Sequence, residues 1–369
     1  MMILVINPGS TSTKISVFNN RECLFTSSVF HDAPLLMSYK TVNDQLPFRL
    51  DVTMKMLKEH SINIENISYI VGRGGSAHSQ HSGLTIVDET LYRDTYNEVA
   101  KTDHPAKLGV MCAYELSKKY NIPAFTINPT NTDELIDEAR ITGIKGLYRR
   151  PQSHVLNQKA VVKLQAKKLG KEEKECSFVC AHIDGGITVA AHKCGRMIDS
   201  TEGAGGDGAF TPTRLGSIPV LGICRFLEKG HSIDELKHLC SQSGGFVSHF
   251  GTSDAKKVYE LMKEGDKHAT LVWNTMLYQT SKAIGEMAVV LSGKVDNIIL
   301  TGGLVRYKEV VDYITEHTSF IAPIALYPGE VEQEAMAWAV MDYIEGKTDV
   351  KKYIPKDVFN GFYWDDIIY

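Results

Sequence analysis

A turn near the start of the chain is rich in groups that can bind an anion. The segment NPGSTSTK at 7–14 follows a short apolar run, and a second β-rich run at 15–18 comes directly after it. Strand, turn and strand are therefore predicted. The hydroxyls of Ser10 and Ser12, the ammonium of Lys14 and the turn's backbone N–H groups are donors that suit phosphate. An ordinary hairpin, whose hydroxyls only satisfy the turn backbone, is an equal alternative from this segment alone.

Two arginines stand among small residues. Arg73 lies within GRGG at 72–75, and Arg214 lies within TPTRLG at 211–216. The guanidinium fork binds carboxylate or phosphate with two parallel hydrogen bonds, and glycine neighbours leave room for the anion. Anion binding is predicted for both arginines.

Two histidines are further candidates. His154 precedes a predicted helix, and His182 lies near the end of a predicted buried strand, just before Gly185 and Gly186. A histidine at a strand end is often only a hydrogen-bonded core residue, so the pattern leaves that alternative open for His182.

The elements that must position these residues alternate between strands and helices. In the first half we expect strands at 3–6, 15–18, 22–29, 69–71 and 124–127 and helices at 50–59 and 105–120. In the second half we expect strands at 177–183, 187–192, 196–199 and 295–300. Three strands with a polar or glycine-rich first turn therefore occur twice, which predicts an internally duplicated α/β fold.

A third glycine pair, Gly302-Gly303, follows the last of these strands. Taken alone, a simple strand-to-helix turn is the more common meaning of such a pair. Two phosphate-binding turns facing one another, with this third glycine pair beyond them, would suit a nucleotide. The Walker pattern is absent and the first turn leads into a strand, so a P-loop fold is not expected.

Bulk composition narrows the class of partner. The chain has 369 residues, 43% of them hydrophobic, and a net charge of −4. This charge offers no broad attraction to nucleic acid or to an anionic membrane, so neither partner is expected. Seven scattered cysteines without a C-x-x-C pair predict reduced thiols, and we expect a cytoplasmic protein that acts on small molecules.

Seven segments together resemble the butyrate kinase family, which belongs to the acetate kinase group of the acetate and sugar kinase/actin superfamily. They are NPGSTSTK at 7–14, GRGG at 72–75, HVLNQKAV at 154–161, AH with GG at 181–186, DG at 207–208 with Arg214, LTGG at 300–303 and YPGE at 327–330. The match is collinear over nearly the whole chain, which makes it more specific than any one motif.

The resemblance implies an α/β fold of two ribonuclease-H-like domains, each with a βββαβαβα core, around a central cleft. By position, the first domain would hold residues 1–148 and 333–369, and the second 149–332. The resemblance also implies phosphorylation of a short-chain carboxylate, such as butyrate, by ATP with Mg²⁺, giving an acyl phosphate and ADP. A homo-oligomer, dimeric or larger, is expected as well.

The same resemblance implies roles for single residues. Arg73 and Arg214 would lie beside the carboxylate and the transferring phosphoryl group, and His154 and His182 would support the transfer. The remaining assignments are phosphate-loop residues Asn7, Ser10, Ser12 and Lys14, nucleotide-site glycines Gly185, Gly186, Gly302 and Gly303, and metal-associated residues Glu332 and Asn128.

Two positions depart from the family's pattern. Asn128 stands where the family commonly has a metal-linked aspartate, although Asp133 lies nearby, and Asp184 stands where a glycine is usual. An amide offers an oxygen but no charge, and a carboxylate at 184 would either repel nucleotide or recruit Mg²⁺. These two departures motivate one alternative to a butyrate kinase, a catalytically weakened nucleotide-binding homologue. The other alternative is a kinase for isobutyrate, propionate, acetate or another short-chain carboxylate, because the sequence does not place the apolar side chains that set the size of the pocket.

Overall fold

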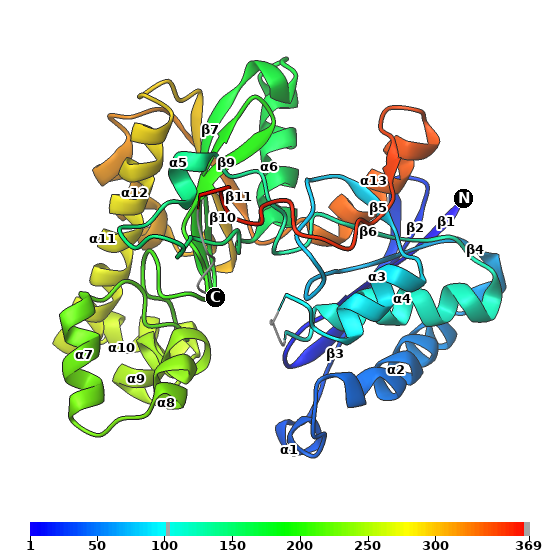
Figure 1. Ribbon diagram of the computed structural model, residues 1–369, viewed down its shortest axis with the longest axis horizontal. Helices are drawn as coiled ribbons and strands as arrows, with labels where there is room; N and C mark the ends of the chain where they lie inside the picture. The colour runs from blue at the N-terminus through cyan, green and yellow to red at the C-terminus, as the bar shows by residue number, and fades with distance from the viewer. Residues whose placement is uncertain (101–103, 365–369) are drawn as a thin grey trace. The chain divides into compact units, whose positions relative to one another are not determined.

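The chain forms two compact units in the computed structural model, which describes residues 1–100 and 104–364 (Figure 1). Unit 1 comprises residues 1–133 together with the segment that begins at Val331, and unit 2 comprises residues 134–330. The chain passes between the units at 133/134 and 330/331. The sequence analysis placed these boundaries at 148/149 and 332/333.

Unit 1 is built on a mixed sheet with the strand order β12-β5-β6-β4-β1-β2-β3. Its strands are β1 (Met2–Pro8), β2 (Ser12–Asn19), β3 (Glu22–Phe30), β4 (Ile67–Gly72), β5 (Leu84–Ile86), β6 (Ala124–Ile127) and β12 (Val350–Lys351). The first three strands form the predicted antiparallel meander, and Ile3 pairs with Phe18 across the first hairpin. β1, β4 and β6 are mutually parallel neighbours, so their carboxyl ends lie at one edge of the sheet.

Helices cover both faces of this sheet (Figure 1). They are α1 (Ala33–Met37), α2 (Leu46–Glu59), α3 (Glu89–Tyr96), α4 (Lys107–Tyr120) and α13 (Glu332–Ile344). Alternate residues of a strand face opposite sides. Leu4 and Ile6 accordingly belong to the core with α2 and α4, and α13 packs against the same strands from the other side.

Unit 2 repeats the arrangement with the order β11-β10-β7-β8-β9. Its strands are β7 (Ser177–Ile183), β8 (Ile187–Lys193), β9 (Arg196–Ser200), β10 (Asn297–Gly302) and β11 (Ile324–Pro328). The positions of β7 to β9 next to β10 and β11 match those of β1 to β3 next to β4 and β6. The predicted duplication of the fold is therefore confirmed.

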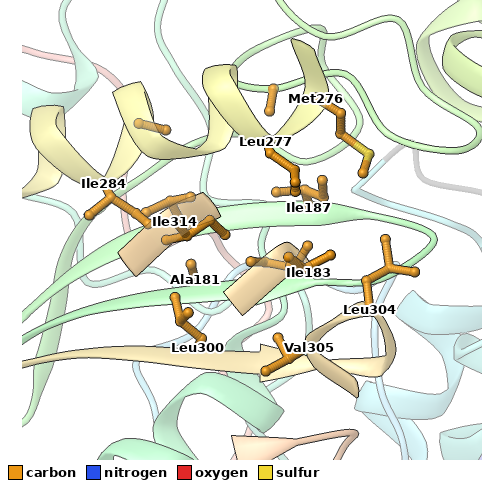
Figure 2. Close-up of a cluster of buried hydrophobic side chains, with 14 of the residues drawn as sticks. Ala181, Ile183, Ile187, Met276, Leu277, Ile284, Leu300, Leu304, Val305 and Ile314 are labelled. Carbon is orange, nitrogen blue, oxygen red and sulfur yellow. The ribbon is translucent and has the colours of Figure 1, made fainter. Parts of the chain in front are cut away.

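The helices of unit 2 leave the two faces of its sheet chemically different. They are α5 (Asp137–Arg140), α6 (Val155–Lys168), α7 (Val220–Glu228), α8 (Ile233–His238), α9 (Gly245–Phe250), α10 (Ala255–Lys263), α11 (Lys267–Val290) and α12 (Lys308–Thr318). Figure 2 shows Leu277 of α11 next to Ile187 of β8, and Ile284 of α11 next to Ile314 of α12, within an apolar core. The alternate residues, His182 among them, face the side that α6 covers.

Some element boundaries differ from the sequence-based expectation. The helix expected at 50–59 begins at Leu46, because a proline in its first turn needs no N–H partner there. The strand expected at 295–300 is β10, which begins at Asn297, and the short strand β5 was not expected. Within the described residues, no helix combines the length and apolar character that a membrane crossing requires.

Candidate active site

The carboxyl edge of β1, β4 and β6 collects three of the predicted residues in unit 1. Asn7 lies near the end of β1, Arg73 follows β4 and Asn128 follows β6. In α/β sheets, ligands bind outside the carboxyl ends of parallel strands, so this edge is the expected position for a site.

Arg73, which is partly buried, forms one polar cluster at this edge with the buried residues Asn7 and Glu332. The Arg73 guanidinium is 2.7 Å from a Glu332 carboxylate oxygen and donates to the Asn7 side-chain oxygen at 3.3 Å. The Asn7 amide donates to the same Glu332 oxygen at 2.9 Å. Glu332 is the first residue of α13, and 2% of its side chain is exposed. Residues 7, 73 and 332 are far apart in the sequence, and the fold brings them together.

A close backbone approach fixes the position of Arg73. A Cβ atom at Gly72 would lie 2.0 Å from the carbonyl oxygen of Gly109, so α4 can approach β4 only where both residues are glycine. The Arg73 N–H donates to the Ile6 carbonyl, and the Arg73 carbonyl accepts from Val110. The backbone of Arg73 is thus held between β1 and α4 while its side chain reaches Glu332.

A buried arginine lies under the turn at 7–14. Arg49 of α2 is fully buried and donates to the carbonyls of Ser12 and Gly9, at 2.8 and 3.2 Å, and to the Thr13 hydroxyl at 2.8 Å. Its remaining partner is the Gln45 side-chain oxygen, and in the described part of the chain no carboxylate pairs with it. Burial lowers the pKa of Arg49 below its usual value. A cation therefore lies beneath the turn, and no carboxylate of the described residues neutralises it.

Asn128 serves the backbone in this structure. It adopts a left-handed conformation, with φ of 43°, and its side-chain oxygen accepts the Gly83 N–H at 2.8 Å. That interaction uses one lone pair of the oxygen, and no hydrogen bond joins Asn128 to the Arg73 cluster within the described residues. Asp133, the neighbour that sequence analysis considered as a substitute ligand, is also buried.

A pocket in unit 1 begins at Gly74 and Gly75, directly after Arg73. Its empty space is about 390 Å³, open solvent included. Leu91 and Val110 contribute apolar wall, and the hydroxyls of Thr95 and Thr126 are buried without a hydrogen-bond partner among the described residues. The pocket is therefore partly polar.

The two predicted histidines lie against each other in unit 2. The rings of His154 and His182 are stacked, with centroids 3.9 Å apart and planes 8° apart. His154 is the N-cap residue of α6, and His182 is on β7, where it pairs with Thr188 of β8 on one side and Thr301 of β10 on the other. The structure thus places His182 in a polar group and not in the apolar core of α11.

Arg214 occupies the space that two glycines leave. A Cβ atom at Gly186 would lie 2.6 Å from an Arg214 nitrogen, and one at Gly203 would lie 2.9 Å from the same atom. That nitrogen donates to the Gly203 carbonyl at 2.6 Å, whereas the buried Nε has no partner in the described chain. Burial lowers the pKa of Arg214 below its usual value. A buried donor without an acceptor favours an oxygen-rich ligand.

Asp184 links the glycine-rich turns that sequence analysis assigned to nucleotide. Its carboxylate accepts the Gly303 N–H at 2.6 Å and the Gly185 N–H at 2.8 Å. Gly302, next to Gly303, has φ of 101°, and a Cβ there would lie 2.3 Å from the Ile183 carbonyl oxygen. The two turns therefore adjoin within unit 2, and an internal anion uses two of their N–H groups.

Possible metal ligands occur in both units. In unit 1, Glu332 offers its carboxylate and Asn7 offers its amide oxygen, both of which accept from Arg73, and oxygen is the donor type that Mg²⁺ takes. In unit 2, ligand atoms of His182, Asp184 and Glu330 all lie within 4.8 Å of one another. Mg²⁺ prefers oxygen ligands, so Asn7 and Glu332 resemble a magnesium site more closely than the group that includes the His182 nitrogen.

Comparison with known proteins identifies the family. The Acetokinase family profile matches residues 141–321. Butyrate kinase 2 from Clostridium acetobutylicum is 40% identical over 352 residues, which cover 95% of this chain and 99% of that protein. A sequence identity of this size over nearly the full length of both chains shows that they share a family. The chain belongs to the acetokinase family.

Solved structures share the fold at low sequence identity. Porphyromonas gingivalis acetate kinase has a TM-score of 0.76 and 17% identity, with 93% of this chain and 99% of that one covered. A propionate kinase from Francisella tularensis has a TM-score of 0.72 and 16% identity, with 92% and 98% covered. The predicted fold class, two ribonuclease-H-like domains, is confirmed by these matches.

Sequence reasoning missed two features of the site. Arg49 lies inside an amphipathic helix, where an arginine is usually expected to face solvent. Only the structure shows that it is completely buried. The bond from Asp184 to Gly303 joins residues 119 positions apart, and no local pattern indicates it.

Proposed function

We propose that this protein is a short-chain carboxylate kinase that transfers the γ-phosphoryl group of ATP to butyrate, giving butyryl phosphate and ADP. The 40% identity to a butyrate kinase along nearly the whole chain carries the proposal. The polar clusters of the two units support it, because they hold the residue types that this chemistry needs.

A carboxylate nucleophile needs no general base, so the catalytic demand is electrostatic. The attacking carboxylate and the γ-phosphate are both anions, and they approach only if cations and hydrogen-bond donors balance their charge. Arg73 and Arg214 supply guanidinium groups, and the unpartnered buried Nε of Arg214 supports anion binding there. His154 and His182 supply ring donors for the transferring phosphoryl group.

Nucleotide binding is assigned to the turns. Ser10, Ser12 and Lys14 would bind phosphate with the positive charge of Arg49 beneath them. In unit 2, Gly185, Gly302 and Gly303 provide backbone that can approach a nucleotide closely. Gly186 has a different role in our proposal, because its missing side chain makes room for Arg214.

Mg²⁺ fits the oxygen donors of unit 1. Glu332 and Asn7 would hold it together with the phosphates of ATP, since protein sites for Mg²⁺ commonly provide one or two carboxylates and leave the rest to substrate and water. When bound, the ion neutralises charge on the β- and γ-phosphates. Asn128 is the weaker candidate, because Gly83 already uses its oxygen.

The pocket behind Arg73 favours a second candidate substrate class. If the tail of the carboxylate enters this pocket, the unsatisfied hydroxyls of Thr95 and Thr126 in its wall favour a tail that carries a hydroxyl over an alkyl tail. A hydroxylated short-chain carboxylate is therefore the alternative to butyrate.

A substrate panel tests the proposal. Folded protein with Mg²⁺ and ATP is incubated with acetate, propionate, butyrate, isobutyrate or 3-hydroxybutyrate, and the acyl phosphate is trapped as its hydroxamate. We expect butyrate or isobutyrate to give the highest kcat/KM. No hydroxamate from any member of the panel would refute the kinase proposal, and a clear preference for 3-hydroxybutyrate would favour the alternative.

Variants connect turnover to the site. Arg73→Ala and Arg214→Ala should each lower kcat by about 10²–10³, the usual loss when one charge-stabilising donor is removed. Arg93→Ala is the matched control, because Arg93 is exposed and lies on α3. Near-normal rates in both site variants would overturn their roles.

Location and assembly complete the proposal. All seven cysteines are free, as suits the reducing cytoplasm in which we place the enzyme. We also propose a homo-oligomer of two or more chains, and light scattering of the purified protein tests it.

A further inference from the structure

Two neighbouring amides at the start of α6 lie behind the stacked histidines. Asn157 and Gln158 are fully buried, and each is linked to one histidine by a short chain of hydrogen bonds. These chains reach the Nδ1 atoms of the rings. The position of each ring proton follows from counting donors and acceptors along them.

The chain to His182 begins at a backbone carbonyl. The Thr301 hydroxyl oxygen is 2.9 Å from the Gly329 carbonyl oxygen, so the single hydroxyl proton must lie between these two oxygens. Thr301 can then only accept from Asn157, whose side-chain nitrogen is 3.0 Å away. The second N–H of the same amide points to His182 Nδ1, also at 3.0 Å. Nδ1 of His182 is therefore an acceptor, and the proton of the neutral ring is on Nε2.

The chain to His154 begins at His192. Burial lowers the pKa of His192 to about 3, so this ring is neutral, and its Nε2 lies 3.1 Å from the Gln158 side-chain oxygen. The Gln158 nitrogen lies 3.2 Å from the Thr188 carbonyl oxygen, which fixes the amide with its N–H₂ group toward Thr188. A reversed amide would place two carbonyl oxygens together and leave an N–H of His192 unpaired, because Nδ1 has no partner among the described residues.

The Thr188 hydroxyl connects Gln158 to His154 and so determines the ring proton of His154. The hydroxyl oxygen accepts from Gln158 at 2.9 Å and from the His154 backbone N–H at 3.4 Å, which uses both lone pairs. The hydroxyl proton must then be donated to His154 Nδ1, 2.9 Å away. The proton of the neutral His154 ring is therefore also on Nε2.

We infer that Asn157 and Gln158 are positioning residues that hold His182 and His154 in the Nε2–H tautomer, so that the stacked pair offers two neutral ring donors to the transferring phosphoryl group. The inference rests on the proposed function for the identity of the acceptor. The tautomers themselves follow from the hydrogen-bond chains. Neutral donors suit this pair, because two imidazolium ions 3.9 Å apart would repel each other.

The Nε2 proton also decides how His182 relates to Asp184 and Glu330. Nε2 lies 3.7 Å from a Glu330 carboxylate oxygen, and an anion there suits an N–H group. A protonated ring nitrogen has no lone pair for a cation. Both Asp184 oxygens also accept backbone N–H groups. We therefore assign the three residues as a ring donor beside two carboxylates and not as a metal centre.

Nitrogen NMR tests the tautomers directly and without substrate. The full chain is labelled with ¹⁵N-histidine, and long-range ¹H–¹⁵N spectra distinguish protonated from unprotonated ring nitrogens. Spectra of His154→Gln and His182→Gln identify the two signals among 13 histidines. We expect Nδ1 to be unprotonated in both rings. A protonated Nδ1 in either ring of the wild type would overturn the inference for that ring.

Two variants switch the rings one at a time. Asn157→Asp replaces a donor by an acceptor, so His182 should gain a proton on Nδ1 while His154 is unchanged. Gln158→Glu should draw the Thr188 hydroxyl proton to the new carboxylate, so His154 should gain a proton on Nδ1 while His182 is unchanged. Each variant controls for the other, and a variant that leaves its own histidine unchanged contradicts the relay.

Kinetics separates positioning from general damage. Each variant should lower kcat by about 10²–10³, as for the loss of one preorganised donor, with the KM for ATP changed less than about threefold. Gln165→Glu also buries a carboxylate on α6 but contacts Asn297 and Tyr327, so it should retain kcat. An equal loss of kcat in Gln165→Glu would show that a buried charge on α6 is sufficient to explain the effect.

A milder variant serves if the charged ones do not fold. Thr301→Val removes the hydroxyl that orients Asn157, and both tautomers of His182 should then be populated. Thr280→Val is its control, because Thr280 is a buried threonine of α11 whose hydroxyl donates to the Met276 carbonyl. A single, unchanged tautomer in Thr301→Val would contradict the chain of bonds. If the wild type forms no acyl phosphate, the proposed function fails, whereas the NMR result still decides the tautomers.

Discussion

The carboxylate of Asp184 accepts the backbone N–H of Gly303 at 2.6 Å. The same carboxylate accepts the Gly185 N–H, so a side chain of the protein takes the position of an anion between two glycine-rich turns. Sequence analysis left open whether Asp184 repels nucleotide or recruits a cation. The observed bonds favour competition with phosphate for the same donors.

Asp184→Asn should therefore strengthen ATP binding. The change removes a negative charge from the proposed phosphate site, and we expect the Kd for ATP, measured by calorimetry, to fall roughly tenfold, about 1.4 kcal/mol. Asp296→Asn is the control, because Asp296 also accepts a backbone N–H in unit 2 but pairs with Lys171. An unchanged or weaker Kd in Asp184→Asn would show that this carboxylate does not oppose nucleotide.

Arg49→Met should weaken ATP binding. The buried guanidinium holds the carbonyls of Gly9 and Ser12 and has no carboxylate partner among the described residues, so its field acts on whatever anion the turn binds. We expect a roughly tenfold higher Kd for ATP, about 1.4 kcal/mol. Arg49→Lys keeps the charge and should lose less. Equal losses in the two variants would assign the effect to hydrogen bonding alone.

Asn128→Asp should lower the Mg²⁺ concentration that half-saturates turnover. Aspartate tolerates the left-handed backbone at this position and still accepts the Gly83 N–H, so the change adds a charge without disturbing the loop. We expect roughly a tenfold shift, about 1.4 kcal/mol, in a magnesium titration of the initial rate. Asn128→Ala loses both properties and should reduce the free energy of unfolding by about 1–2 kcal/mol. An unchanged magnesium requirement in Asn128→Asp would remove position 128 from the metal site.

His192 should make the stability of unit 2 dependent on pH. Its pKa is lowered from 6.5 to about 3 by burial and by the charge of Lys159. Between these values the unfolded chain binds a proton that the folded chain does not, so the free energy of unfolding falls as pH falls from 6.5 toward 3. At pH 5 the loss is about 2 kcal/mol.

Urea unfolding at pH 7.5 and pH 5.0 measures this loss. Carboxylates contribute as well, so the quantity of interest is the difference between the wild type and His192→Gln, a variant that cannot titrate. The wild type should lose about 2 kcal/mol more than the variant. Parallel losses in both proteins would mean that His192 is protonated in the folded chain.

Short-range patterns account for most of the fold that sequence analysis predicted. The alternation of apolar residues and the turn at 7–14 define the first hairpin, and the same pattern around Gly185 defines the second. The sequence analysis did not predict β5, because a strand of three residues shows no hydrophobic periodicity. Its pairing with β6 also joins segments that are far apart in the sequence. The helix expected at 50–59 begins four residues earlier, at Leu46, and a proline lies in its first turn, where it needs no N–H partner.

The chemistry was predictable by residue type but not by partner. Arg73, His154 and His182 stand out through their neighbours in the sequence. The ion pair from Arg73 to Glu332 and the stacking of His154 on His182 join distant segments, so only the folded chain shows them. Gly186 was assigned to nucleotide by the resemblance and by its place in the second glycine-rich turn, and in this structure its missing side chain leaves room for Arg214.

Glu332 lies near the C-terminal end of the sequence, and this position affects the order in which the two units fold. Helix α13, which carries Glu332, is synthesised after all of unit 2, yet it packs against β1, and its Gln333 donates to Ser16 of β2. As the chain leaves the ribosome, residues 134–330 are complete before the first unit has received its final helix. The segment that emerges first should therefore finish folding last, and until then Arg73 lacks its carboxylate partner.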